Sequence, residues 1–234
     1  MRKVGIIIFA IALVIGLVAT NLFSFGRMSA CNLKFSFGIG PGVRGSGNVI
    51  TEKRQISDFT GIETGGIFQV TVVAQKEFGL EVEADDNLLP LIRTEVRDGV
   101  LRIDSDSKFK SSNPVRIRIS APDIDRLDVS GVSNVSLSNV SNSDIEIHVS
   151  GASKVNVSGE TERINLDISG ASKVNAEELK AKSAVIDASG ACQATVNVTD
   201  EIRSDLSGAS KVVYLGSPAS VVTKRSGVSS IIAK

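Results

Sequence analysis

The side chains best suited to chemistry recur at one position of a repeated octet, as in DISGASKV at 167–174. Four aspartates stand two residues before a Ser-Gly pair: Asp128, Asp167, Asp187 and Asp205. β-Helical enzymes that act on polysaccharides place carboxylates on adjacent turns, where one serves as acid and another as base. Aspartates are also common turn formers at corners, and aromatic residues, which line most sugar-cleaving grooves, make up only 4% of the chain. We therefore predict surface aspartates and no catalytic residues.

A second position of the octet carries Lys154, Lys173 and Lys211. Stacked like charges repel each other, so something must offset these lysines. One interpretation is a solvated face on which the aspartates and lysines pair locally. The alternative is that anionic glycans or phospholipid head groups bind there.

Other kinds of site are disfavoured by the composition. The single histidine, His148, stands where other repeats have aspartate, and Cys192 stands where they have serine. We therefore predict no metal site, no cofactor and no disulfide framework. Lysine plus arginine and aspartate plus glutamate both number 26, without a basic cluster, so we predict no nucleic-acid partner.

The repeat itself must position these side chains. Its Ser-Gly pairs begin at Ser130, Ser150, Ser169, Ser189, Ser207 and Ser226, so the gaps are 20, 19, 20, 18 and 19 residues. Apolar residues alternate before each pair, as in Ile145, Ile147 and Val149. Alternation with a period of two indicates a strand with one buried face. Such a short unit buries its apolar row only by stacking on the next copy.

The predicted fold is all-β: a right-handed parallel β-helix, a single-stranded solenoid with about 19 residues per rung and rungs about 4.8 Å apart. That rung length gives a perimeter of about 60 Å, which suggests three short faces. Glycine permits a corner with positive φ or a close approach of rungs. We expect Ala152, Ala171 and Ala209 at a tight interior corner, and a ladder of serine hydroxyls along the axis.

The first half of the chain contains an earlier copy of the repeat. IETGGIFQV at 62–70 aligns with LDVSGVSNV at 127–135, which places Gly65-Gly66 over Ser130-Gly131. We therefore predict one β-helix domain over 50–234, with irregular first rungs at 50–125 and regular rungs at 126–234. RDGV at 97–100 indicates a hairpin, and DDNLLPLI indicates a turn or short helix.

The N-terminus resembles an export signal, because Arg2 and Lys3 precede an apolar run from Val4 to Ala19. This run is about long enough to span a bilayer as a helix, and Cys31 ends a lipoprotein-like stretch and is a candidate lipidation site. Residues 1–31 are thus a retained anchor, a lipidated leader or a cleaved signal, and each exports the remainder. The glycine-rich residues 32–49 read as a linker.

Two longer stretches resemble a known bacterial family. GSGNVITEKRQISDFTGIETGGIFQVTV, then LEVEADDNLLPLIRTEVRDGVLRI, then serial SGAS rungs are similar to the DUF2807 family of auto-transporter adhesins with a head GIN domain. The resemblance runs from about Gly45 to the C-terminus. It implies a single-stranded right-handed β-helix exported by bacteria with an envelope, and it carries over no catalytic residues.

These patterns predict a non-enzymatic, exported protein of the cell envelope, held to a membrane by its N-terminus. It would act as an adhesin or interaction module for glycans, envelope proteins or its own copies. Lys224, Arg225 and Lys234 in the last rung would form a charged cap. Two alternatives stay open: a polysaccharide-active enzyme using the aspartates, and a structural or stress-related envelope module.

Overall fold

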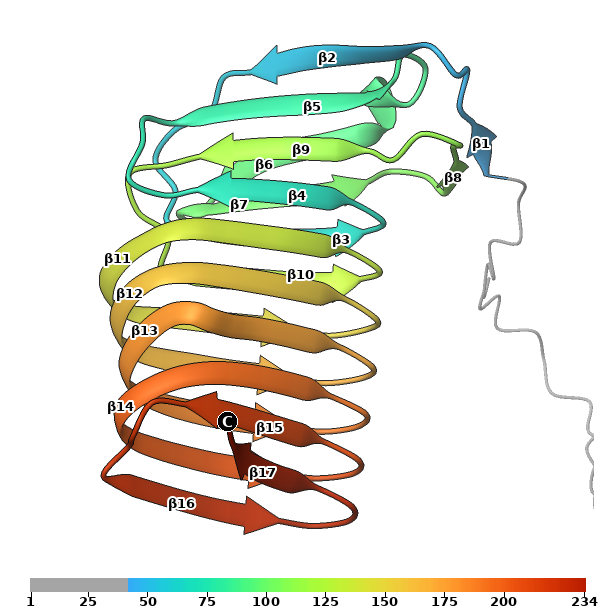
Figure 1. Ribbon diagram of the computed structural model, residues 1–234. Coiled ribbons are helices and arrows are strands. Elements are labelled where there is room, and N and C mark those ends of the chain that lie inside the picture. The colour runs from blue at the N-terminus through green and yellow to red at the C-terminus, as the bar shows by residue number, and fades with distance from the viewer. Residues whose placement is uncertain (1–41) are drawn as a thin grey trace, which may run out of the picture. The chain divides into compact units, whose positions relative to one another are not determined.

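The computed structural model describes residues 42–234, which form a parallel β-solenoid of about five turns (Figure 1). Each regular rung consists mainly of one long strand that pairs in parallel with the next. The regular strands are β10 Arg126–Gly131, β11 Asn134–Val149, β12 Lys154–Ile168, β13 Lys173–Ala188 and β14 Gln193–Leu206. The last turn breaks into β15 Lys211–Leu215, β16 Ser220–Arg225 and β17 Ser230–Ala233.

Every long strand bends in its middle and lies on two faces. In Figure 1 its first half runs from right to left along the near side, and its second half returns along the far side as the chain descends, which is the right-handed sense. We call these the front face and the back face. The structure thus has two faces instead of the three that the perimeter suggested, because the strand stays continuous through its bend. In β11 the pairing with β12 is irregular between Leu137 and Val140.

The register between rungs confirms the spacing of the repeats. Asp128 pairs with His148, His148 with Asp167, Asp167 with Asp187, and Asp187 with Asp205. These steps are the same 20, 19, 20 and 18 residues that separate the Ser-Gly pairs in the sequence. Equivalent residues of the octet therefore stack directly over one another.

The Ser-Gly corner explains most of the octet. Gly151 has a φ of 80°, and a Cβ placed on it would overlap the carbonyl oxygen of Gly131 in the rung before. The backbone N–H of Ala152 donates to that same carbonyl at 2.9 Å. Only glycine meets both conditions, the positive φ and the close approach.

The interior corner that was predicted for Ala152, Ala171 and Ala209 is occupied instead by the second serine of the octet. Ala152 is exposed, whereas Ser153 is buried and donates from Oγ to the carbonyl of Gly131 at 3.2 Å. The serine is preferred inside because its hydroxyl satisfies a backbone carbonyl at the buried corner. The same position forms the predicted ladder, and Cys192 fills it in one rung, with Sγ 3.6 Å from the carbonyl oxygen of Gly170.

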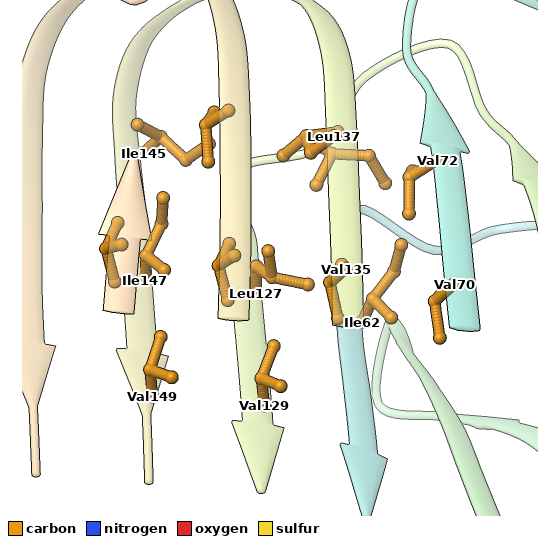
Figure 2. Packing of buried hydrophobic residues seen from close by; sticks show 14 of the residues in the cluster. Ile62, Val70, Val72, Leu127, Val129, Val135, Leu137, Ile145, Ile147 and Val149 are labelled. Atoms are coloured by element: carbon orange, nitrogen blue, oxygen red, sulfur yellow. The ribbon is translucent and has the colours of Figure 1, made fainter. Parts of the chain in front are cut away.

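Inward-facing side chains form apolar columns between the two faces (Figure 2). Ile62, Leu127 and Ile147 follow one another in register on the back face, and Val70 stacks with Val135 on the front face. All five side chains are at most 2% exposed. Burying each contributes about 1.5–3 kcal/mol, so every rung stabilises both of its neighbours.

The N-terminal part is a cap in which strand order departs from chain order. The rung of β3 and β4 lies between β10 and β11 on one side and β7 and β9 on the other, while β6, β5 and β2 add antiparallel strands. These elements are β2 Val49–Arg54, β3 Gly61–Gly66, β4 Gln69–Val73, β5 Gly79–Asp85, the 3-10 helix η1 Leu89–Leu91, β6 Ile92–Arg97, β7 Val100–Ser105 and β9 Arg116–Ser120. The hairpin predicted at RDGV is confirmed, because Arg97 pairs with Val100.

The sequence analysis predicted that the folded domain begins at Ile50. The structure shows that it begins earlier, at strand β1 (Val43–Arg44). This strand pairs with β8 (Phe109–Lys110). Asp86 then accepts hydrogen bonds from the Ser46 hydroxyl at 2.5 Å and from the Asn48 amide at 3.0 Å. Residues 43–49 of the predicted linker are therefore part of the packed unit.

No helix within residues 42–234 is long and apolar enough to cross a membrane. The predicted export signal or anchor at 1–31, the candidate lipidation site Cys31 and linker residues 32–41 lie outside the described residues.

Candidate binding surfaces on the two faces

The predicted aspartates form one column on the back face. Its order across the rungs is Glu63, Asp128, His148, Asp167, Asp187, Asp205 and Lys224. Glu63 was missed as a member, although aligning 62–70 with 127–135 already places it over Asp128. The column is acidic for most of its length, with Arg102 paired in register to Glu63 at one end and Lys224 at the other.

Only part of this column lines a groove, and within that part Asp128 is paired with Arg126. A groove of about 420 Å³ is lined by Glu63, Arg126, Asp128, His148 and Asp167, among others. Arg126 Nε lies 2.9 Å from Asp128 Oδ2, and this contact raises the pKa of Arg126. His148 Nδ1 lies 3.7 Å from Asp167 Oδ2.

The groove does not bring two aspartates of adjacent rungs together. Asp128 and Asp167 share the groove but stand two rungs apart, which is roughly 10 Å and at the far limit for inverting glycosidases. Asp167 and Asp187 stand on adjacent rungs, yet Asp187 does not line the groove. Within residues 42–234, no three His, Cys, Asp or Glu side chains come together as a metal site.

The predicted lysines form a column on the front face. Its order is Asn134, Lys154, Lys173, Gln193 and Lys211, so a glutamine interrupts the lysines. The predicted pairing with the aspartates does not form, because the two columns lie on opposite faces with the Ser-Gly corner between them. Among the described residues, Lys154, Lys173 and Lys211 make no ion pair at all.

Next to the lysines runs a column that the sequence analysis missed. It consists of Ser136, Asn156, Asn175 and Thr195, two residues further along each strand. The signal was present in the sequence as the Lys-Val-Asn that follows two SGAS corners, at 154–156 and 173–175. Thr195 is buried, but the amides and hydroxyl of the other three both donate and accept hydrogen bonds, so this part of the column suits a polar ligand.

An exposed apolar ridge runs along the corner between the faces. Ile67, Val132 and Val228 occupy the alanine position of the octet in three rungs and are 65%, 57% and 86% exposed. Alanines occupy the rungs between Val132 and Val228. Contiguous apolar rows on a protein surface occur more often at interaction sites than elsewhere on the surface.

Comparisons with known proteins agree with this architecture. Residues 58–218 match the DUF2807 family, described as "putative auto-transporter adhesin, head GIN domain". No curated protein matches the chain significantly. A putative adhesin from Bacteroides fragilis has a similar structure with a TM-score of 0.68 at 21% identity, covering 82% of this chain and 100% of that one. This likeness shows the fold.

Two structures from Parabacteroides distasonis are less similar. A putative adhesin aligns with a TM-score of 0.49 and a putative lipid binding protein with 0.48. Both are 18% identical, and both alignments cover 82% of this chain and 99% of the other. The family match alone spans more than half of the sequence, from the cap into the last turn. The chain therefore belongs to the DUF2807 family of auto-transporter adhesin-like proteins with a head GIN domain.

Proposed function

We propose that the protein is a non-enzymatic binding module of the cell envelope, exported and held there by its N-terminal segment. The observation that carries this proposal is the arrangement of charge. Like-charged side chains stand in register on two opposite outer faces, while the space between the faces is filled by buried apolar side chains. The surface that such a molecule offers to a partner is therefore its flat faces, as expected of an adhesin-like protein.

Export and anchoring rest on Arg2, Lys3 and the apolar run that follows them. Cell fractionation with mass spectrometry of the mature N-terminus tests this part. An intact N-terminus in the membrane fraction indicates a retained anchor, a lipid on Cys31 indicates a lipoprotein, and a new N-terminus indicates cleavage. Unprocessed protein in the cytoplasmic fraction would contradict export.

Binding is tested with the full-length protein in mild detergent, on a glycan array and in a pull-down from envelope extracts. We expect capture of at least one glycan class or envelope protein that depends on charged residues of a face. If both assays stay empty, the protein is better explained as a structural envelope module.

A second candidate function, cleavage of a polysaccharide, is favoured only by the groove that holds Asp128, His148 and Asp167. If it holds, Asp167→Asn abolishes a measurable hydrolase or lyase activity. The control is Asp205→Asn, which removes a carboxylate of the same column outside the groove and leaves the activity unchanged. We expect no activity in the unmodified protein.

A further inference from the structure

We propose that the front face binds a linear acidic polysaccharide that lies along the axis of the solenoid, across the strands. This inference rests on the proposed binding function and names the ligand class and the face that takes it.

The first support is that two neighbouring columns of the front face carry no acidic side chain, and Glu177, in the next column, is paired with Lys234. Two neighbouring outward columns cross seven strands, from β9 to β15, and give fourteen positions without one aspartate or glutamate. The first column is Arg116, Gln69, Asn134, Lys154, Lys173, Gln193 and Lys211, and the second is Arg118, Thr71, Ser136, Asn156, Asn175, Thr195 and Val213. The back face carries the aspartates, so the solenoid is polarised across its thickness.

The second support is that only one end of these columns is neutralised. Arg116 and Arg118 pair with Glu83 of the cap, whose pKa is lowered mainly by the hydrogen bond from Arg116. Lys154 and Lys173 stand on adjacent rungs and have no ion-pair partner among residues 42–234. Their repulsion is unrelieved within the described chain, and a bound anion would relieve it.

The third support is the match between this face and a chain of acidic sugars. Ammonium groups bind carboxylates, while the amides of Asn156, Asn175 and Gln193 supply donors and acceptors for sugar hydroxyls. Seven strands span roughly 29 Å at about 4.8 Å per rung, which suits an extended polymer with regularly repeated charges. The fourteen positions include no aromatic side chain, so the face lacks the stacking platforms that single-stranded nucleic acids require.

The test measures binding of the full-length protein, in mild detergent, to immobilised polygalacturonic acid and to the fully methyl-esterified polymer. We expect binding to the acid form, much weaker binding to the ester, and loss of affinity as salt increases. The triple variant Lys154→Gln/Lys173→Gln/Lys211→Gln should weaken binding about tenfold, since each exposed contact contributes modestly.

The chain offers a matched control with the same change in net charge. Lys180, Lys182 and Lys234 are exposed but pair with Glu160, Glu162 and Glu177. The triple variant Lys180→Gln/Lys182→Gln/Lys234→Gln should bind the acid polymer like the unmodified protein. Equal loss in both triple variants would show that net charge alone is responsible and would overturn the proposal.

Three further outcomes would also overturn it. Equal binding of the acid polymer and the ester would exclude carboxylate recognition. Binding to vesicles of phosphatidylglycerol and phosphatidylcholine with the same dependence on Lys154, Lys173 and Lys211, but none to the polymer, would identify an anionic lipid surface as the ligand. If the front face binds no polymer while the array or pull-down still captures a partner, the binding function stands and only this ligand assignment fails.

Discussion

The cap at 42–125 and the regular rungs at 126–234 share one solenoid but are stabilised in different ways. In the rungs, each residue stacks on its equivalent one repeat away, and the same corner hydrogen bond recurs, as from Ala171 to Gly151 and from Ala191 to Gly170. In the cap, strands pair out of chain order and partly antiparallel. Specific side chains such as Asp85 hold its segments together.

This difference teaches where each region is vulnerable. We expect a rung to tolerate substitutions on its surface but not at the stacked corner. A larger residue at the corner would displace the backbone of the neighbouring rung, because the two are in direct contact. The cap buries apolar side chains as well, but its first strands are also joined by a few polar contacts. Asp85 is 2% exposed and accepts hydrogen bonds from Ser111 at 2.6 Å and Asn113 at 2.9 Å.

The largest effect is expected from alanine at a stacked corner. Gly170→Ala should lower the free energy of unfolding by roughly 3 kcal/mol, because the new Cβ meets the carbonyl of Gly151 at a positive φ. Gly99→Ala in the cap hairpin is the matched control, with a φ of 74° but no atom within 4 Å of the Cβ, and should cost about 1 kcal/mol. Denaturant titration measures both, and equal costs would disprove that rung contact dominates.

The next effect concerns the polar tie of the cap. Asp85→Asn replaces one carboxylate oxygen, which accepts a hydrogen bond from Ser111 or Asn113, by an NH2 group that cannot accept it. We therefore expect the cap to open more often in this variant, while the rungs stay closed. Peptide-resolved hydrogen exchange should show faster exchange in β1, β2 and β8, with β12 and β13 unchanged. Asp104→Asn, at an exposed position of the same cap, should change nothing. Uniform acceleration across all strands would contradict independent stability of the rungs.

Lowering the pH should also destabilise the cap before the rungs. Hydrogen bonds from Ser111 and Ser46 lower the pKa values of Asp85 and Asp86, and Arg116 lowers that of Glu83. A carboxylate with a lowered pKa stabilises the fold above its unfolded pKa, and this contribution is lost as pH falls through the folded value. Below about pH 4 the cap should therefore lose protection first.

The measurement is hydrogen exchange between pH 7 and pH 2.5, corrected for the intrinsic pH dependence of exchange. In the rungs, the hydrogen bond from Lys182 lowers the pKa of Glu162, which lies on the exposed surface. Rungs that lose protection at a higher pH than the cap would refute this assignment.

The smallest effect is expected at Cys192. Cys192→Ser restores the residue found at Ser153, Ser172 and Ser210, and its hydroxyl has the same carbonyl of Gly170 to donate to. We expect a change in the free energy of unfolding below about 1 kcal/mol. Cys192→Val, which has a similar volume but no donor, should cost more. The opposite order would show that volume, and not the hydrogen-bond ladder, decides this position.

The sequence by itself determined the regular rungs. The gaps between Ser-Gly pairs gave the register, the alternation of apolar residues gave the buried columns, and the alignment of Gly65-Gly66 with Ser130-Gly131 placed the first rung. This worked because in a solenoid the nearest neighbour in space is one repeat away in the chain. A periodic signal in the sequence is therefore also a map of contacts.

Only the tertiary structure decided the cap and the meaning of the charges. Nothing local shows that β3 lies between β7 and β10, or that Asp85 meets Ser111, because these partners are separated by irregular lengths of chain. Asp167 and Lys173 are six residues apart, and the sequence suggested that such aspartates and lysines form ion pairs. The corner between them turns one to the back face and the other to the front, so the chain has two faces of opposite character instead of one neutral surface.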